Sequence, residues 1–244
     1  MQAIILAAGM GKRLKELTKD NTKCMVKVNN VSLIERALSS LDKLNLNRII
    51  IVDGYSSEKL RIFISQLKVN TKIEYINNPI FDTTNNIYSL WLAKDSLTQD
   101  DTLLLESDII FEDAVLHDLY FDGRKDLALV AKYEDWMDGT CLKLNEDDSI
   151  KDFIPGKLFN ENEKSVYYKT VNFYKFSKEF SKELYIPELE QYRKEFGDNE
   201  YYEAALGRII KRNTSSLKAR RLENQKWYEI DNAFDLEAAS KLFR

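Results

Sequence analysis

The sequence predicts an α/β fold, with three layers and a mixed, mostly parallel sheet that has helices on both faces. Two observations predict it. Short apolar runs, typical of strands buried on both faces, alternate with amphipathic helical segments over about the first 110 residues. Further strand and helix patterns follow without an internal repeat, a low-complexity tract or a linker. We therefore expect one domain over 1–244, and the sequence leaves open whether it is the N-terminal domain of a longer fusion protein.

In the first half, the patterns follow the order strand, helix, strand, helix, strand, helix, strand, as in a parallel sheet with crossover helices. Strands are expected at 3–7, 48–52, 72–76 and 102–106. Helices are expected at 33–44, 58–68 and 87–97. Ser32 stands directly before the first of these helices and is a residue type that caps helix N-termini.

The second half is expected to complete the sheet and to form one wall of a cleft. Strands are expected at 127–133, 140–144, 167–176, 217–222 and 226–230. Helices are expected at 113–121, 177–196, 200–212 and 232–243. Pro187 should break the second of these helices, because proline lacks the N–H that a helix interior needs.

Composition excludes several classes of protein. A hydrophobic fraction of 44% and a charged fraction of 31% are typical of globular proteins. The net charge of −4 argues against a nucleic-acid partner, and no apolar run is long enough to span a membrane. The two cysteines, Cys24 and Cys141, are too few for a disulfide framework or a four-thiolate zinc site, so a reducing cytoplasm is expected. The single histidine, His117, has no nucleophile signature nearby. The sequence gives no indication of the oligomeric state.

The first motif with chemical meaning follows the first strand, where Gly9-Met10-Gly11 is succeeded by Lys12 and Arg13. Two glycines allow a tight turn, and the backbone N–H groups of such a loop can surround phosphate oxygens while the cations add charge. The P-loop motif is excluded because Arg13 follows Lys12, and the dinucleotide fingerprint is excluded because position 14 is Leu. The alternative is an ordinary strand-to-helix turn with surface cations.

A longer sequence motif distinguishes a phosphate-binding loop from an ordinary strand-to-helix turn. Leu6-Ala7-Ala8-Gly9-Met10-Gly11-Lys12-Arg13-Leu14, followed by Thr18 and Thr22-Lys23-Cys24-Met25-Val26, resembles the signature of the nucleotidyltransferase family. That signature is Leu-Ala-Ala-Gly-x-Gly-x-Arg-Leu, a short spacer and Pro-Lys, and this chain departs from it with Thr22. The resemblance implies a Rossmann-like fold of the GT-A type and an enzyme that acts on sugar-1-phosphates or phosphocholine.

Three later motifs extend the resemblance over nearly the whole chain. Asn85-Asn86-Ile87-Tyr88-Ser89-Leu90 looks like a motif of the choline-phosphate cytidylyltransferase branch. Glu106-Ser107-Asp108 and Tyr228-Glu229-Ile230-Asp231 stand where the family places its metal-binding aspartates. The resemblance therefore implies Mg²⁺ held by Asp108 and Asp231, which suits a hard cation that prefers carboxylate oxygens. Glu106 and Glu229 are either supporting groups or plain surface charges.

The resemblance also implies roles for residues in a nucleotide-binding half, 1–113. The nucleotide-binding candidates are Ala8, Gly9, Gly11, Lys12, Arg13, Asn86 and Ser89. The catalytic candidates are Arg13, Lys23 and Asp108. Lys23 is expected near the attacked α-phosphorus, and CTP is expected as the nucleotide because that branch uses it. No general base is required, because the acceptor oxygen is already ionised.

An acceptor-binding half is expected at 114–244, where aromatic and acidic residues cluster. Aromatic faces with nearby carboxylates suit an ammonium group. The acceptor-binding candidates are Lys132, Trp136, Asp138, Lys169, Tyr202 and Glu203, and each is alternatively a core, turn or surface residue. Trp136–Thr140 and Lys169–Asn172 resemble the 2-aminoethylphosphonate cytidylyltransferases. The implied reaction joins CTP to this amine-bearing phosphonate and releases pyrophosphate.

Other functions stay open at this point. Choline phosphate or phosphoethanolamine is the nearest alternative acceptor, and sugar-1-phosphate is a more distant one. A non-catalytic nucleotide-sensing module would be expected to lack Arg13, Lys23 or an aspartate, and all are present. A glycosyltransferase would be expected to carry Asp-x-Asp where this chain has Glu106-Ser107-Asp108.

Overall fold

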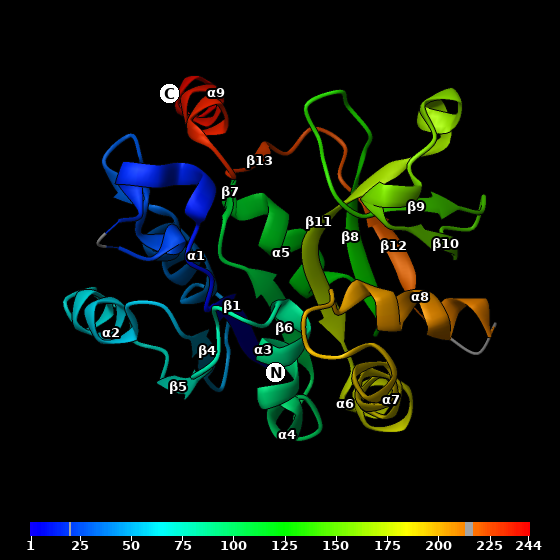
Figure 1. The fold of residues 1–244 in the computed structure, drawn as a ribbon, viewed down its shortest axis with the longest axis horizontal. Coiled ribbons are helices and arrows are strands. Elements are labelled where there is room, and N and C mark those ends of the chain that lie inside the picture. The colour runs from blue at the N-terminus through cyan, green and yellow to red at the C-terminus, as the bar shows by residue number, and fades with distance from the viewer. Residues whose placement is uncertain (20, 213–216) are drawn as a thin grey trace.

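The computed structural model describes residues 1–19, 21–212 and 217–244. A nine-stranded mixed sheet runs through both halves of the chain (Figure 1). Its strands are β1 (Gln2–Ala7), β4 (Ile49–Asp53), β5 (Ile73–Asn77), β6 (Thr102–Glu106), β8 (Leu127–Lys132), β9 (Cys141–Leu144), β10 (Ile150–Ile154), β11 (Tyr168–Phe176) and β12 (Lys218–Arg221). The main path is β10-β9-β11-β6-β1-β4-β5, and β8 pairs with both β11 and β12. The pairs among β6, β1, β4 and β5 are parallel, whereas β11 is antiparallel to β6, β8 and β9.

Helices cover both faces of this sheet, as the sequence predicts. Their bounds are α1 (Leu33–Leu41), α2 (Ser57–Ser65), α3 (Asn86–Leu92), α4 (Lys94–Leu97), α5 (Asp113–Phe121), α6 (Lys178–Phe180), α7 (Ile186–Phe196), α8 (Glu203–Lys211) and α9 (Ala233–Leu242). All six residues of β1 are buried, and from Ala3 to Ala7 they alternate between two cores. Ile5 packs with α1, α2 and α5, while Ile4 packs with α3, α4, α7 and α8.

Most of the expected elements are found close to their predicted places. Ser32 caps α1 as predicted, because its Oγ accepts a hydrogen bond of 3.2 Å from Glu35 N. The single helix expected at 87–97 is wrong, since the chain divides into α3 and α4 at Ala93. The Ala93 N–H bonds to the carbonyl of Leu90, three residues earlier, and this tighter turn separates the two helices.

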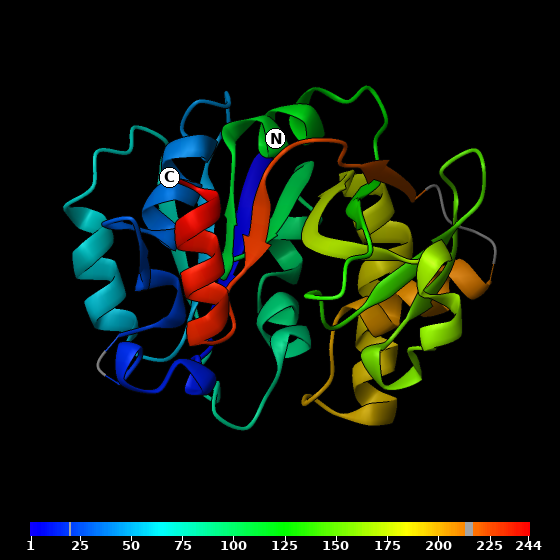
Figure 2. The ribbon, with the colours of Figure 1, turned by 90° about the horizontal axis from the view of Figure 1, so that it is seen from above.

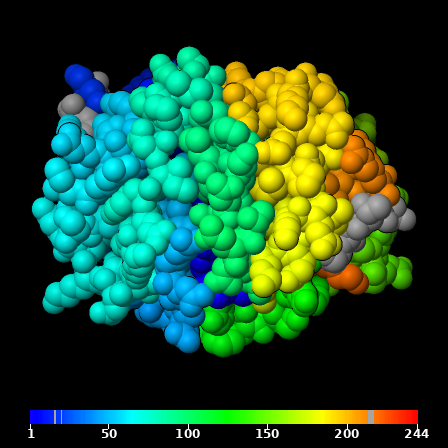
Figure 3. Space-filling model, turned by 90° about the horizontal axis from the view of Figure 1, so that it is seen from below, coloured from blue at the N-terminus to red at the C-terminus, as the bar shows by residue number. Residues whose placement is uncertain are grey.

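Pro187 does not end the helical run in which it lies. The chain passes from α6 through a π-helical turn (Ser181–Tyr185) directly into α7. Pro187 falls in the first turn of α7, a position that tolerates proline. On the face shown in Figure 3, α3 and α4 (green) meet α7 (yellow), and the Arg193 guanidinium lies 3.9 Å from the Trp91 ring centroid.

One expected strand lies outside the main sheet. The strand expected at 226–230 is β13 (Trp227–Glu229), and it pairs antiparallel with β7 (Ile109–Phe111), a strand that the sequence did not indicate. The Ile230 N–H also donates to the Asp108 carbonyl at 2.9 Å. This small sheet lies beyond the carboxyl end of β6 and leads into α9 (Figure 2, red).

Helix α9 packs on the N-terminal region of the chain. Asn232 and Asp235 form a capping box at the start of α9. Ala239 of this helix packs in one core with Leu14, which follows the glycine loop, and with the hairpin of β2 (Lys27–Val28) and β3 (Val31–Ser32). The glycine loop and the β13 segment are therefore held against each other. Within the described ranges, no helix is both long and apolar enough to cross a bilayer.

Candidate active site

Three carboxylates meet at the carboxyl end of β6. Asp108, Glu229 and Asp231 each offer an oxygen, and these atoms lie within 4.8 Å of one another. Pairing of β13 with β7 brings the last two residues to Asp108, although they are more than a hundred positions away in the sequence. The sequence predicts Asp108 and Asp231 but leaves Glu229 undecided. The alternation of side chains along a strand, which places residues 229 and 231 on one side, is the signal that could have included Glu229.

Lys23 lies between two of these carboxylates. Its Nζ is 2.6 Å from Asp108 Oδ2 and 2.6 Å from Asp231 Oδ1. Burial disfavours the charge of Lys23, but the ion pairs with Asp108 and Asp231 outweigh burial and raise its pKa. Arg13 also contacts Asp231, at 2.7 Å, and its side chain is 65% exposed. Two cations therefore contact Asp231, the partly buried Lys23 and the exposed Arg13.

The glycine loop approaches Lys23 closely. Gly11 has a φ of 62°, in the left-handed region, and a Cβ at this position would lie 2.9 Å from Lys23 Cβ. The Gly11 carbonyl accepts a hydrogen bond of 2.9 Å from Thr18 Oγ1. A Cβ at Gly9 would meet nothing within 4 Å. Gly11 is thus required by both backbone conformation and packing, whereas Gly9 is free to approach a ligand. Of the neighbouring candidates, Ala8 is buried and Lys12 is exposed.

We expect Gly11→Ala to lower both stability and turnover. The left-handed backbone and the close approach to Lys23 should reduce the free energy of unfolding by about 1–3 kcal/mol. The added methyl group should also displace Lys23 from Asp108 and Asp231. Thermal unfolding and kcat measure the two effects. Gly123→Ala is the control, because a Cβ there meets nothing within 4 Å and the backbone has no positive φ. Equal stability and turnover in Gly11→Ala and the wild type would refute the expectation.

The carboxylate group fits a divalent cation. Carboxylate oxygens are the ligands that Mg²⁺ prefers. Asp108 Oδ1 is buried and receives no hydrogen bond from the residues that the structure describes. A buried carboxylate oxygen without a partner is costly unless a ligand completes it. Asp108, Glu229 and Asp231 are therefore the residues that could hold a metal ion.

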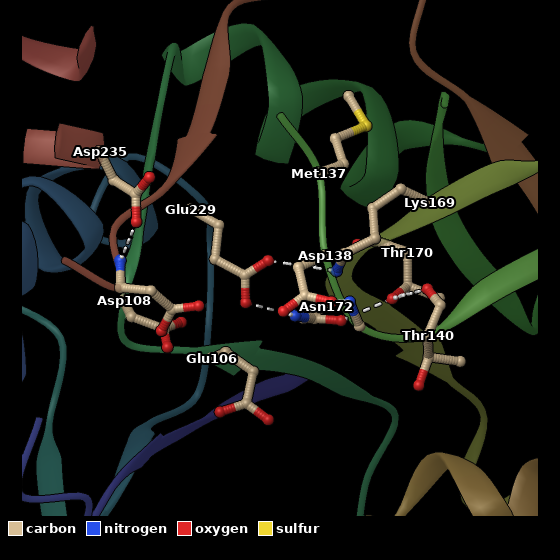
Figure 4. Close-up of polar contacts among 12 residues, drawn as sticks. Glu106, Asp108, Met137, Asp138, Thr140, Lys169, Thr170, Asn172, Glu229 and Asp235 are labelled. Carbon is tan, nitrogen blue, oxygen red and sulfur yellow. Dashed lines mark hydrogen bonds and ion pairs between the residues drawn. The ribbon is translucent and has the colours of Figure 1, made fainter. Parts of the chain in front are cut away.

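Lys169 contacts the carboxylate group through Glu229. Its Nζ is 3.2 Å from Glu229 Oε2 and donates to the Thr170 carbonyl at 2.8 Å. The Lys169 side chain is only 2% exposed, and a Cβ at Gly139 would lie 3.8 Å from its Nζ. Figure 4 shows Glu229 between Asp108 and the side chains of Lys169 and Asn172. The structure thus encloses Lys169 beneath the turn that Asp138 begins.

A second acidic group, Glu106 and Glu203, lies beside the first. Its contacts join the nucleotide-binding half to the acceptor-binding half. Asn86 Nδ2 donates to Glu106 Oε1 at 2.9 Å, and Asn86 Oδ1 accepts from the Tyr202 backbone N–H at 3.0 Å. Burial raises the pKa of Glu203 to about 7, and burial with the nearby Asp108 raises that of Glu106. Glu203 Oε2 and the Tyr202 hydroxyl are buried without a hydrogen bond to any described residue. The sequence predicts Asn86, Tyr202 and Glu203 as site residues, but not that Asn86 links them to Glu106.

The other predicted residues contact different partners. Ser89 is buried and bonds to Asn78 Nδ2 at 3.1 Å. The Trp136 ring stacks on Tyr228, with centroids 4.0 Å apart, and Asp138 Oδ1 accepts from the Gly139 N–H. Lys132 Nζ donates to the Ser165 carbonyl and lies 4.6 Å from the Tyr168 ring centroid. Direct contacts thus join Arg13, Lys23, Asp108 and Asp231, and Lys169 joins them through Glu229.

Comparison with known proteins identifies the family of this chain. The sequence profile of the family described as "Nucleotidyl transferase" matches residues 2–137, which carry the glycine loop, Lys23 and Asp108. The chain belongs to the nucleotidyl transferase family. This confirms the family that the glycine-loop motif indicated, and this nucleotidyltransferase is accordingly an enzyme.

Two sequence relatives and one solved structure are similar to the nucleotidyltransferase. It is 27% identical to CMP-5'-(3-aminopropyl)phosphonate synthase of Streptomyces rubellomurinus, over all of this chain but only 39% of that protein's length. It is 27% identical to CTP:phosphoglutamine cytidylyltransferase of Campylobacter jejuni, over 97% of this chain and 98% of that one. The structure of CTP:phosphocholine cytidylyltransferase from Streptococcus pneumoniae superposes with a TM-score of 0.82 at 24% identity, covering 100% and 99% of the two chains. That superposition confirms the predicted fold.

Proposed function

We propose that this nucleotidyltransferase transfers a cytidylyl group from CTP to 2-aminoethylphosphonate and releases pyrophosphate, with Mg²⁺ as the metal. CTP would bind to the 1–113 half and the acceptor to the 114–244 half. The observation that carries the proposal is the position of Lys23 between Asp108 and Asp231, next to the glycine loop. Cations beside a carboxylate group are what a metal–triphosphate substrate requires. Because CTP is an intracellular metabolite, we place the reaction in the cytoplasm.

The reaction needs charge neutralisation and alignment more than proton transfer. A phosphonate oxygen attacks the α-phosphorus in line, the new P–O bond forms, and the bond to pyrophosphate breaks. The backbone of Gly9 and Gly11 approaches the triphosphate, and Arg13 with Lys12 stabilises the leaving pyrophosphate. Lys23 holds the α-phosphoryl group. Mg²⁺ bound by Asp108, Glu229 and Asp231 would neutralise further charge on the phosphates.

The charges of the site favour an acceptor that carries an amine. The three cations Arg13, Lys23 and Lys169 form ion pairs with Asp231, Asp108 and Glu229. No ion pair within 4.0 Å joins Glu106 or Glu203 to a described residue. An ammonium group would balance this second acidic group, which lies beside the buried Tyr202. The names of the three relatives also combine a phosphate or phosphonate with a nitrogen-bearing group.

The phosphonate end of the acceptor has two candidate lysines. Lys132 lies at the surface beside Tyr168. Lys169 is enclosed beneath Gly139, so its contact with a phosphonate requires the turn at Asp138 to move. Asn86 and Ser89 remain the proposed pyrimidine contacts, and both lie at α3.

Phosphocholine is the second candidate acceptor, with phosphoethanolamine as its primary-amine counterpart. The stacked rings of Trp136 and Tyr228 offer an aromatic surface, and a quaternary ammonium group binds well to such a surface. Asp138 and Glu134 add negative charge near Trp136, since Glu134 accepts a hydrogen bond from Trp136 Nε1 at 3.0 Å. This acceptor would keep the same mechanism at the α-phosphorus.

Pyrophosphate release with Mg²⁺ tests the proposal. The assay crosses CTP, UTP, dTTP and ATP with 2-aminoethylphosphonate, phosphocholine, phosphoethanolamine and glucose-1-phosphate. Propylphosphonate is the matched control, because a methyl group replaces the amine. We expect turnover with CTP and 2-aminoethylphosphonate, and about tenfold lower kcat/KM with propylphosphonate, since leaving a buried carboxyl group without a hydrogen-bond partner costs about 1–3 kcal/mol. Preference for phosphocholine would favour the second candidate. No turnover with any pair, while CTP still binds, would overturn the enzymatic assignment for these acceptors.

A further inference from the structure

Strand β11 departs from regular geometry next to the carboxylate group. Its pairing with β8 shifts register between Thr170 and Tyr174, and we call this segment, 170–174, the β11 bulge. Asn172 lies within it with a φ of 58°, in the left-handed region. Asparagine tolerates this conformation better than most residues. Bulges re-aim side chains at functional sites, so the contacts of Asn172 are informative.

Both the oxygen and the nitrogen of the Asn172 side-chain amide have hydrogen-bond partners. Its Oδ1 accepts a hydrogen bond of 2.6 Å from Thr170 Oγ1, and its Nδ2 faces Glu229 Oε1 at 3.4 Å. The Thr170 hydroxyl, which also lies 3.2 Å from the Thr140 carbonyl, contacts the Oδ1 end of the amide, while Nδ2 faces Glu229. Lys169 holds the other oxygen, Glu229 Oε2, at 3.2 Å. Each oxygen of the Glu229 carboxylate thus has a separate partner from β11 (Figure 4).

These contacts cross between two sheets. Glu229 belongs to β13, which pairs with β7, whereas Asn172 and Lys169 belong to the main sheet. Asp108 receives its own backbone contact from the Ile230 N–H. The orientation of the Glu229 carboxylate is therefore set from the main sheet, while its backbone is set by the small sheet.

We propose that Asn172 is a positioning residue, which orients Glu229 from the β11 bulge so that Glu229 can complete the carboxylate group for a divalent metal. The proposal rests on the metal site described under the proposed function. Groups that hydrogen-bond to metal ligands fix their orientation, and their loss weakens metal binding by about 10- to 100-fold. The left-handed backbone at Asn172 places the amide so that its Nδ2 faces Glu229.

Direct metal binding tests this role in the 244-residue chain. Mn²⁺ serves as the probe, and free Mn²⁺ is measured by electron paramagnetic resonance. Asn172→Gly removes the amide while keeping a residue that adopts positive φ without strain. We expect its Kd for Mn²⁺ to rise about tenfold. Asn30→Gly is the matched control, since Asn30 also has a positive φ, of 69°, in the β2–β3 turn. Its Kd should equal that of the wild type.

A double-mutant cycle separates positioning from a general loss of structure. If Asn172 acts through Glu229, Asn172→Gly should weaken Mn²⁺ binding little further when Glu229→Gln is already present. Thr170→Val leaves residue 172 intact and removes the hydroxyl that contacts the Asn172 amide and the Thr140 carbonyl, so it should weaken binding in the same direction. Wild-type affinity in Asn172→Gly, or additive losses in the double variant, would overturn the proposal. If Asp231→Asn also binds Mn²⁺ as the wild type does, the metal site itself is wrong and both conclusions fall.

Discussion

Lys23→Ala is expected to lower kcat by at least about 10²-fold, as for the loss of one preorganised electrostatic group. Lys23 is 14% exposed and bridges Asp108 and Asp231. Under the proposed function, its ammonium would stabilise the charge that develops on the α-phosphoryl group. Its raised pKa keeps it charged throughout the neutral range. The charge is therefore available without any change of protonation. Steady-state turnover with saturating CTP and acceptor measures the effect.

Two features of this experiment make it specific. Lys27→Ala is the control, since Lys27 is an exposed lysine on β2 only four positions away. Thermal unfolding of both variants shows whether the fold is kept. In Lys23→Ala, the Mg²⁺ concentration that gives half-maximal activity should not rise, because a competing cation has left the aspartates. Near-normal kcat in Lys23→Ala would show that Lys23 is not catalytic.

Asp108→Asn and Asp231→Asn are expected to lower activity by at least about 10²-fold, through the metal rather than through the nucleotide. Each variant removes a charged ligand from the carboxylate group, and Asp231→Asn also removes the shared partner of Arg13 and Lys23. In contrast to Lys23→Ala, the Mg²⁺ concentration for half-maximal activity should rise. Titration of activity with Mg²⁺, together with Mn²⁺ binding, measures the change.

The control for the aspartate variants is Asp135→Asn. Asp135 is 82% exposed and pairs with Lys164 at the surface, so its loss should change neither activity nor metal dependence. An unchanged Mg²⁺ requirement in both Asp108→Asn and Asp231→Asn would contradict a metal site at these residues. A loss that higher Mg²⁺ restores would support it.

Much of the site could be predicted because its signals are local. The apolar run of β1, the glycine loop and Lys23 lie within about the first 26 residues, and the short-range order of apolar, glycine and basic residues indicates a phosphate-binding turn. Asp108 follows a strand whose burial is evident from Leu103 to Leu105. Local patterns locate these residues along the chain, and the resemblance to the nucleotidyltransferase family implies their roles at the site.

What could not be predicted depends on contacts between distant segments. Strand β13 is expected from the sequence, but β7 has only three residues, too few for a pattern, and only the pairing of the two strands brings Glu229 beside Asp108. Lys169 has the residue type expected for gripping an anion, yet Glu229 and the turn at Gly139 enclose it. The bulge at Asn172 follows from the register of β11 against β8, which the sequence of β11 alone does not determine.

The most direct test of the central claim is identification of the product by ³¹P NMR. The nucleotidyltransferase is incubated with CTP, 2-aminoethylphosphonate and Mg²⁺, and all phosphorus signals are followed. The proposed reaction predicts equal amounts of pyrophosphate and of a product in which a phosphonate phosphorus and a phosphate phosphorus couple across a new P–O–P bridge. Release of CMP and pyrophosphate with the phosphonate unchanged would instead show hydrolysis, and would contradict transfer to this acceptor.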